Sequence, residues 1–388
     1  MGSNVASSDC SAFYNITEET VSEWLFTPAD SIIITVITPI IMALGLINNT
    51  IFLFVILRSP KMRSETNIYL AHLAIADLLY LILSVFHDLV MYKTGPTIRG
   101  SVIRGTFLMS SAECICFIIV TNTAYFASIV FLTMVSFERY LAMCHPIKHL
   151  KIRGQHRTNK TVAICWLVGL IFSGLTLPGS AKHVIKCLQW PDDEMYHGFP
   201  STVASCGAVQ PWVIYYTTPL LNIPWLIALV ANIYMFVKII QTLHKRKSTL
   251  GMTQRYNEAV HTRNQVAKML IVNGIVFFIC QTPYRVISLT AWVSLLAQIP
   301  DPIHARLGLA KVWVSLIPQY VNTVVNPLIY GVMSSQYRSA LIDAFQRKRR
   351  SRNKEVSATI SSNVINEPET DMRSSNTFKD NEKVESRL

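Results

Sequence analysis

The sequence predicts an all-α membrane protein, a bundle of seven transmembrane helices followed by a short amphipathic eighth helix. The chain has 388 residues, of which 51% are hydrophobic and only 15% are charged, whereas soluble proteins carry about 25% charged residues. A helix needs about 20 mostly apolar residues to cross a bilayer, because no water there can satisfy exposed backbone groups. Seven stretches meet this requirement: 31–57, 67–91, 112–136, 161–178, 212–237, 269–296 and 308–332.

The distribution of charge predicts the orientation of the chain. Residues 1–30 contain five acidic residues and no Lys or Arg, so they lack the basic start of a cleaved signal peptide. The loops after the first, third and fifth stretches are basic, and such loops stay on the cytoplasmic side. We therefore expect 1–30 to be an extracellular segment, 31–332 to form the bundle in the plasma membrane, and the C-terminus to be cytoplasmic. The net charge of +12 follows from these loops and does not require nucleic acid as a partner.

Two further segments follow the seventh stretch. Residues 333–346 place Tyr337, Leu341 and Phe345 at helical spacing, which predicts a short amphipathic helix on the inner membrane surface, in contact with lipid. Residues 347–388 start with a basic run and are then rich in Ser, Thr, Asn and charge. We expect this tail to be disordered, cytoplasmic and open to phosphorylation.

The predicted outer side carries features of an exposed, oxidised surface. Asn15 begins the sequon Asn15-Ile16-Thr17 and is the candidate glycosylation site. Five of the eight cysteines lie at or beyond the outer ends of the helices, where disulfides can form. These cysteines are Cys10, Cys114, Cys116, Cys187 and Cys206.

Charged and kink-forming residues inside the stretches need a reason, because a charge in the middle of a membrane costs several kcal/mol. Asp77 lies in the second stretch, with Asn49, Asn322 and Asn326 available as partners. It is either a hydrogen-bonded structural acid or part of an oxygen-rich site for a small cation. The third stretch ends in Glu138-Arg139-Tyr140, and Pro283 and Pro327 provide kinks in the last two helices. Such kinks suit a bundle with two conformations.

These marks together resemble the rhodopsin-like class of G-protein-coupled receptors. They are Asn49, the block Leu73 to Asp77, Glu138-Arg139-Tyr140 followed by His145-Pro146, Trp166, Pro283, and Asn326-Pro327-Leu328-Ile329-Tyr330. The resemblance covers about residues 31–346. Within this class, the stretches Met62 to Asn67, Phe137 to Pro146 and Phe277 to Val286 look like the thyrotropin-releasing hormone, ecdysis-triggering hormone and neuromedin U receptor group.

The resemblance implies roles for several groups of residues. The coupling and activation groups would be Glu138, Arg139, Tyr140, Tyr234, Phe277, Asn326, Pro327 and Tyr330. In the resting state Glu138 would hold Arg139, since Arg263 stands where many members have an acid that could share this lock. The partners implied are a heterotrimeric G protein, and receptor kinases and arrestin at the phosphorylated tail.

The resemblance also implies an allosteric sodium ion and a disulfide. The sodium site would consist of Asp77, Ser128, Asn322 and Asn326, and no other cofactor is required. Cys114 would pair with a cysteine of the outer loop 179–211, and we favour Cys206 over Cys187. Cys10 is a candidate partner for Cys187, which the sequence does not decide. Gln281 replaces a usual tryptophan, which leaves the usual activation switch in doubt.

The same comparison with the receptor class excludes two classes of ligand. Thr121 stands where amine receptors have an aspartate and Tyr320 where opsins have a lysine, so we do not expect an amine or retinal. The candidate ligand-binding residues are Asp88, Thr121, Asn122, Tyr284 and Arg285. Asp88 would receive a cationic ligand group and Arg285 a carbonyl or terminal amide. The alternative is that Asp88 and Arg285 simply pair with each other.

We therefore predict a receptor for an extracellular neuropeptide, amidated and with a basic residue near its C-terminus. A receptor of the same class for a lipid or other small molecule is the main alternative. A transporter is less favoured because no internal repeat is visible. We do not expect an enzyme, because no nucleophile with a base and an orienting group can be assembled from these stretches.

Overall fold

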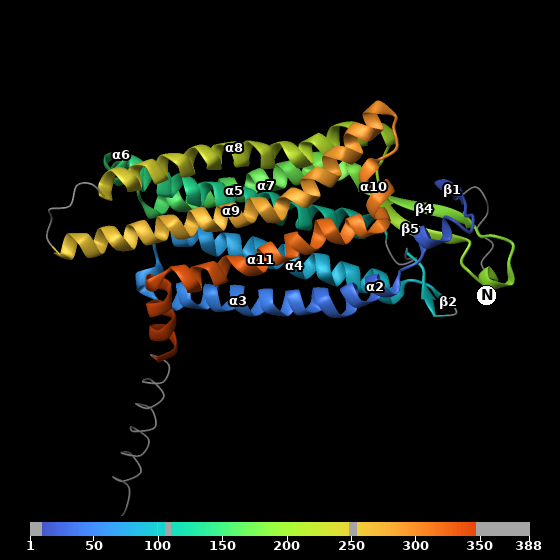
Figure 1. Cartoon of the computed structure of the whole chain (residues 1–388), viewed down its shortest axis with the longest axis horizontal. Coiled ribbons are helices and arrows are strands. Elements are labelled where there is room, and N and C mark those ends of the chain that lie inside the picture. The colour runs from blue at the N-terminus through green and yellow to red at the C-terminus, as the bar shows by residue number, and fades with distance from the viewer. Residues whose placement is uncertain (1–9, 99, 105–109, 248–253, 347–388) are drawn as a thin grey trace, which may run out of the picture. The chain divides into compact units, whose positions relative to one another are not determined.

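The computed structural model describes residues 10–98, 100–104, 110–247 and 254–346. Seven long helices in these residues run side by side (Figure 1). They are α3 (Thr38–Arg58), α4 (Glu65–Thr94), α5 (Ser111–Cys144), α7 (Gln155–Thr176), α8 (Ile214–Lys247), α9 (Gln254–Ala297) and α11 (Lys311–Met333). Six of the seven are long and apolar enough to cross a membrane. The seventh, α11, is less apolar because it buries Gln319, Asn322 and Asn326. The predicted seven-helix bundle is confirmed.

The first membrane helix begins earlier than predicted. Thr27 caps α2 (Pro28–Ile32), since its hydroxyl accepts from the Asp30 backbone and its own N–H donates to the Asp30 carboxylate. A π-helical turn, η2 (Ile33–Ile37), then leads into α3. The continuous helical segment is therefore Pro28–Arg58.

The third long helix, α5, is the centre of the packing, with α4, α7, α8 and α9 as its neighbours. Gly169 allows α7 to approach α5 closely, because a Cβ atom at this position would lie 2.8 Å from the Thr123 carbonyl oxygen. The Ser173 hydroxyl donates to the Ile119 carbonyl across the same contact at 2.9 Å. Small residues at a helix contact are typical of packing inside membranes.

One end of the bundle carries short β-strands that the sequence analysis did not predict, in the long loop and in part of residues 1–30. Strands β4 (Lys182–Gln189) and β5 (Thr202–Gly207) pair antiparallel, and β1 (Ala12–Asn15) adds to β4 in parallel. A short hairpin of β2 (Thr97–Ile98) and β3 (Ser101–Val102) lies between α4 and α5 in the chain. We call this end the sheet end.

Two disulfides fix the sheet to the rest of the chain. Cys206 of β5 pairs with Cys114 in the first turn of α5, the pairing that the sequence favoured. Cys187 of β4 pairs with Cys10, which closes the question that the sequence left open. A small apolar cluster that includes Ile16, Leu188 and Val203 packs under the sheet. The described part of the N-terminal segment is therefore ordered against the long loop.

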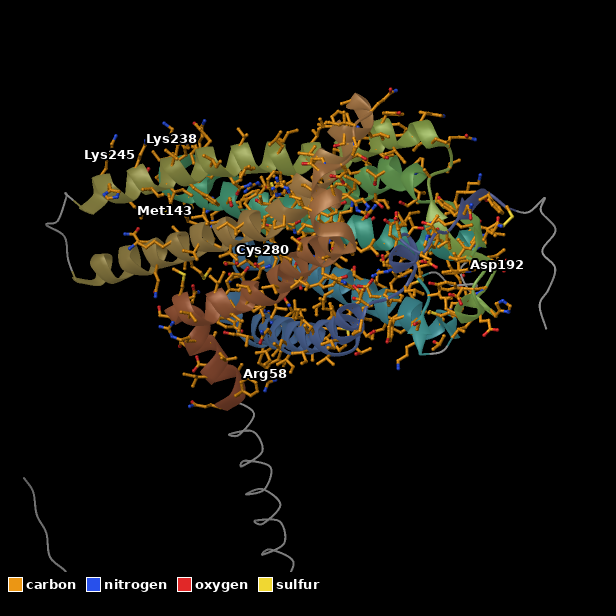
Figure 2. The ribbon with its side chains drawn as sticks, turned by 45° about the vertical axis from the view of Figure 1, so that its right-hand side comes forward. Arg58, Met143, Asp192, Lys238, Lys245 and Cys280 are labelled. Carbon is orange, nitrogen blue, oxygen red and sulfur yellow. A yellow bond between two sulfur atoms is a disulfide. The ribbon has the colours of Figure 1, made fainter. Side chains whose placement is uncertain are left out.

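The opposite end of the bundle carries basic residues. Figure 2 shows Lys238 and Lys245 of α8 far from Asp192, which lies in the turn between β4 and β5. The short helix α6 (Pro146–Ile152) connects α5 to α7 here. Residues 335–346 are helical, as predicted for 333–346, and the Tyr337 ring lies 5.6 Å from that of Phe52. The predicted tail, 347–388, lies outside the described residues.

Candidate functional site

Arg285 of α9 is buried in the half of the bundle nearer the sheet and is held by α8. Only 1% of its surface is exposed. One guanidinium nitrogen donates to the Leu221 carbonyl at 2.6 Å and lies 3.4 Å from the Asn222 amide oxygen. The guanidinium carbon also lies 5.1 to 5.7 Å from the ring centres of Tyr125, Trp225 and Tyr284, which is a cation–π distance. Among the described residues, Nε and Nη2 have no hydrogen-bond partner.

Among the ion pairs of the described residues, none joins Asp88 of α4 to Arg285. The alternative of a direct pair between them is therefore not seen in this structure. The Asp88 carboxylate is half-buried and accepts a hydrogen bond of 2.9 Å from the Tyr320 hydroxyl of α11. Two further rings complete a path to Arg285, with Tyr80 6.1 Å from Tyr320 and 6.1 Å from Tyr125. Tyrosines therefore separate the acid from the base.

The other predicted ligand residues have unequal surroundings. Tyr284 lies against Arg285, as its position predicted. Thr121 is buried, and its hydroxyl has no hydrogen-bond partner among the described residues. Asn122 instead points toward α7, where its amide donates to the Thr176 hydroxyl at 3.3 Å. Asn122 is thus engaged in helix packing.

The sequence analysis missed several residues around these charges. Trp225 and Asn222 of α8, Tyr80 of α4 and Tyr125 of α5 all lie in the path from Asp88 to Arg285 or directly against Arg285. Tyr80 also donates to the Gln319 side chain at 3.1 Å. An available signal was helical spacing, since Tyr80 lies eight residues, or about two helical turns, before Asp88 on the same helix.

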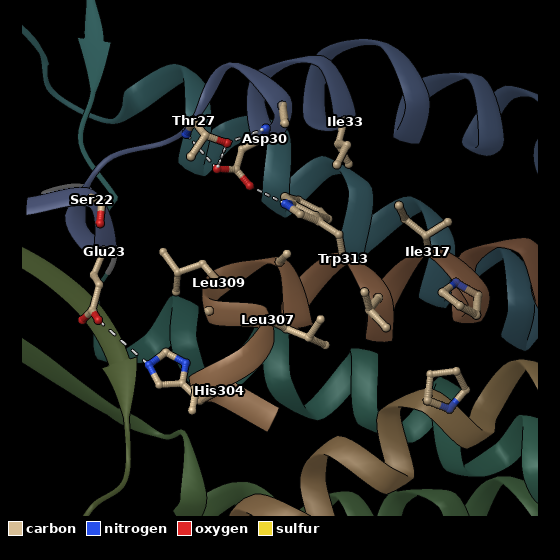
Figure 3. A pocket seen from close by; sticks show the side chains of 17 residues that line it. Ser22, Glu23, Thr27, Asp30, Ile33, His304, Leu307, Leu309, Trp313 and Ile317 are labelled. Carbon is tan, nitrogen blue, oxygen red and sulfur yellow. Dashed lines mark hydrogen bonds and ion pairs between the residues drawn. The ribbon is translucent and has the colours of Figure 1, made fainter. Parts of the chain in front are cut away.

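A separate cavity of about 960 Å³ lies at the sheet end between the N-terminal segment and α11 (Figure 3). Asp30 stands at its edge and accepts hydrogen bonds from Thr27, from Trp313 at 2.5 Å and from Arg104 at 2.6 Å. Burial lowers the pKa of the Arg104 guanidinium, while the Asp30 carboxylate acts in the opposite direction. On the other wall, His304 lies 4.0 Å from Glu23. Asp30 thereby joins the N-terminal segment, the β2–β3 region and α11.

Three of the four predicted sodium-binding residues come together, with Ser128 and Asn326 in contact with the buried Asp77 carboxylate. Asp77 accepts from the Ser128 hydroxyl at 3.0 Å and from the Asn326 amide at 2.6 Å. Asn322 lies four residues before Asn326 on α11 and is buried. Its side-chain oxygen has no hydrogen-bond partner among the described residues. Asn49, expected as a partner of Asp77, instead donates to the backbone oxygens of Gly45 and Thr323, both at 2.9 Å.

At the opposite end, Glu138 has partners that the sequence did not predict. Its side chain is 1% exposed and accepts a hydrogen bond from Arg157 at the start of α7. His149 of α6 lies 3.6 Å from its second oxygen. Arg157 and His149 are additional neighbours of this carboxylate, and its pairing with Arg139 stays a prediction. Sequence distance hid these partners, because α6 folds back along α5.

The remaining coupling residues lie in separate places and do not form one cluster. Tyr140 contacts the His145 ring nitrogen at 3.0 Å through its hydroxyl, and its ring lies 6.0 Å from that of Tyr234. Tyr330 is buried, with its ring 5.0 Å from Phe52. Phe277 and Pro327 are buried in α9 and α11. Tyr234 and Tyr330, both expected among the coupling and activation groups, therefore have different neighbours in this conformation.

The predicted glycosylation site lies at the sheet end. Asn15 is the last residue of β1 and is exposed. The next residue, Ile16, is buried in the cluster below the sheet. The sequon is thus anchored with its asparagine on the surface, and its glycosylation stays a prediction.

A family model described as the 7 transmembrane receptor (rhodopsin family) matches residues 48–330. The chain belongs to this family. Mouse neuromedin-U receptor 2 is 29% identical over 339 residues, which cover 84% of this chain and 79% of that receptor. The mouse thyrotropin-releasing hormone receptor is 27% identical over 330 residues, or 78% and 76% of the two chains. Human neuromedin-U receptor 1 is 27% identical over 322 residues, or 79% and 71%.

The expected resemblance to the neuromedin U and thyrotropin-releasing hormone receptors is thus confirmed. The chain is a multi-pass membrane receptor of the rhodopsin-like class and not an enzyme. The matched region, 48–330, contains both the Asp88 to Arg285 path and the Glu138 cluster.

Proposed function

We propose that this receptor binds an extracellular neuropeptide that is amidated and carries a basic residue near its C-terminus, and that the peptide activates a heterotrimeric G protein. The relatives named above support a neuropeptide as the ligand class. The observation that carries the finer proposal is the separation of Asp88 from Arg285 by tyrosines. Since the two opposite charges do not pair with each other, each keeps hydrogen-bonding capacity that a ligand could use.

Asp88 is the proposed partner of the basic ligand residue. A carboxylate has room for about four hydrogen bonds, and Asp88 accepts only the one from Tyr320 among the described residues. It is also half-buried, so that a cation can reach it while the surrounding side chains exclude part of the water. A charge-assisted hydrogen bond in such surroundings is stronger than one at the surface.

Arg285 is the proposed partner of the amidated end. The Leu221 carbonyl and three aromatic rings fix its guanidinium, which leaves Nε and Nη2 without protein acceptors. Buried donors without a partner cost about 1–3 kcal/mol, so a peptide carbonyl placed there gains free energy. The planar fork of donors suits an amide or carboxyl oxygen.

The proposed orientation puts the sheet end outside and the basic end inside the cell. It rests on the basic loops and on the two disulfides at the sheet end, which require an oxidising compartment. Asp192, Asp193 and Glu194 are exposed in the turn between β4 and β5, where their field would steer a basic peptide inward. In this orientation the Glu138 end meets the G protein, and the tail would meet receptor kinases and arrestin.

We further propose that Asp77, Ser128, Asn322 and Asn326 hold a sodium ion in the resting receptor. The free side-chain oxygen of buried Asn322 supports this donor set. Asn326 presents its amide nitrogen to Asp77, so it would have to turn its oxygen toward the ion. Carboxylate, hydroxyl and amide oxygens are the ligands of hard cations.

The test of the ligand proposal is a panel of amidated peptides applied to cells that express the receptor, with G-protein activation as the readout. For an active peptide, Asp88→Asn and Arg285→Gln should each lower potency by about a hundredfold, since each removes one partner of a desolvated charged contact. The exposed Asp192→Asn is the matched control and should change potency only a few fold.

The decisive step exchanges the basic peptide residue for citrulline, which is neutral and nearly isosteric. The exchange should cost wild-type receptor about a hundredfold and the Asp88→Asn receptor almost nothing more, since coupled losses do not add. Additive losses would show that Asp88 does not contact that residue. Activation by lipid extract and by no peptide would replace the proposal with a lipid receptor.

A further inference from the structure

Three side chains from three different helices meet at the end of the bundle opposite the sheet. Glu65 lies in the first turn of α4, Glu138 near the end of α5 and His149 in α6. One ligand atom of each lies within 4.8 Å of the other two. The His149 Nδ1 and Glu138 Oε2 atoms are 3.6 Å apart. Carboxylate oxygen and imidazole nitrogen are both ligands of transition metals.

The polar atoms that face this cluster are not satisfied by other described residues. Glu138 is 1% exposed, and Arg157 binds only its Oε1 atom. Neither Glu138 Oε2 nor His149 Nδ1 has a hydrogen-bond partner. A buried carboxylate oxygen without a donor is costly, so an additional partner between these two atoms would stabilise the receptor.

Ligand type and spacing favour a metal of the zinc type as this partner. The two carboxylates supply anionic oxygen ligands, and Arg157 binds Oε1 of Glu138, which leaves Oε2 for a divalent cation. Zinc binds nitrogen and oxygen at about 2.0–2.2 Å, which puts tetrahedral ligand atoms about 3.4 Å apart. The 3.6 Å separation of His149 and Glu138 is close to this value. Calcium would require six to eight oxygens.

An ion could reach the cluster from solution. A cavity of about 920 Å³ adjoins it and is lined by Glu65 and His149 together with Arg63, Arg139 and Arg153. Glu65 is half-buried at the rim, so its side chain can close the remaining distance to the ion. Three protein ligands leave a fourth position for water.

We infer that Glu65, Glu138 and His149 form a binding site for a divalent transition-metal ion, with zinc as the best fit, and that the bound ion ties α4, α5 and α6 together. Binding favours the conformation in which His149 lies beside Glu138. A G protein that displaces α6 or draws Glu138 away would compete with the ion, and this coupling is reciprocal. The bound ion would therefore inhibit G-protein activation. This inhibitory role rests on the proposed function, whereas the metal-binding site does not.

Binding is tested on the purified full-length receptor by competition with a fluorescent zinc indicator. Wild type should bind zinc saturably, and His149→Ala and Glu65→Gln should each weaken that binding at least tenfold. His156→Ala is the matched control, because His156 is an exposed imidazole seven residues along the chain, and it should bind as wild type. Glu65→His, which keeps a zinc ligand, should retain the site.

Equal thermal midpoints of wild type and His149→Ala without zinc would verify that the variant is folded. Zinc should then raise the midpoint of wild type only. The absence of saturable zinc binding to wild type, or equal affinity in His149→Ala, would overturn the site.

The inhibitory role is tested in membrane fragments with both faces accessible, by ligand-independent nucleotide exchange on added G protein. Free zinc should lower exchange by wild type and His156→Ala but not by His149→Ala. Zinc binding without an effect on nucleotide exchange would overturn the inhibitory role, while the proposed metal-binding site would stand. A receptor that catalyses no exchange with any peptide but still binds zinc would contradict the proposed function alone.

Discussion

Asp30 connects three parts of the sheet end, and its replacement gives the most direct test of how that end is held together. Its carboxylate accepts from Arg104 of the loop after β3 at 2.6 Å and from Trp313 of α11 at 2.5 Å. It also caps its own helix through Thr27. Asp30→Ala removes all three contacts, whereas Arg104→Gln removes only the ion pair among these three.

The expected magnitude follows from what each partner loses. Trp313 is buried, and a buried N–H without an acceptor costs about 1–3 kcal/mol. Breaking a buried ion pair costs about 3–5 kcal/mol, but Arg104 retains 20% exposure and can turn toward water, so its share is about 1 kcal/mol. We expect Asp30→Ala to destabilise the receptor by about 3 kcal/mol. Arg104→Gln and Asp30→Asn, which can both keep the Trp313 bond, should cost about 1 kcal/mol.

The assay is thermal unfolding of the purified receptor together with surface expression. One kcal/mol lowers the midpoint by about 2–4 °C in domains of 150–250 residues, so Asp30→Ala should lower it by roughly 6 °C or more. Glu23→Gln is the control, because Glu23 is 53% exposed and only 4.0 Å from His304, and should have no effect. A midpoint for Asp30→Ala that equals that of Arg104→Gln would refute the role assigned to the Trp313 bond.

Three further predictions concern the bundle and its disulfides. Arg139→Ala should abolish G-protein activation but leave peptide binding measurable, since coupling between distant sites is about 1–3 kcal/mol and changes affinity by about 5- to 150-fold at most. Undiminished signalling at normal surface expression would contradict this. Cys114→Ala and Cys206→Ala should each lower the stability of the receptor by about 2–5 kcal/mol and lower its surface expression equally. The double variant should lose no more than either single variant. The pair Cys10→Ala and Cys187→Ala should behave in the same way, and unequal losses within a pair would argue against that bridge. Sodium at constant ionic strength should lower agonist affinity in wild type but not in Asp77→Asn, because the ion favours the resting state; an equal sodium response in both would leave Asp77 as a structural acid.

The sequence by itself determined the bundle and its family. Length and apolarity identify membrane helices because the bilayer permits few other structures, and α11 was found although Gln319, Asn322 and Asn326 make it less apolar. The motif residues identified the receptor class because they are local in sequence. Asp77, Ser128 and Asn326 were grouped by resemblance, and the structure brings their side chains within hydrogen-bonding distance.

Only the tertiary structure decided how these residues are paired. Whether Asp88 meets Arg285 depends on the rotation of α4 and α9, and the tyrosines between them come from α4, α5 and α11. Glu138 is joined by Arg157 and His149 because α6 turns back at the end of α5. The partners of a charged residue lie on other helices, and their distance along the chain follows no helical or strand periodicity. Composition fixes which residues enter the membrane, and helix packing fixes which of them touch.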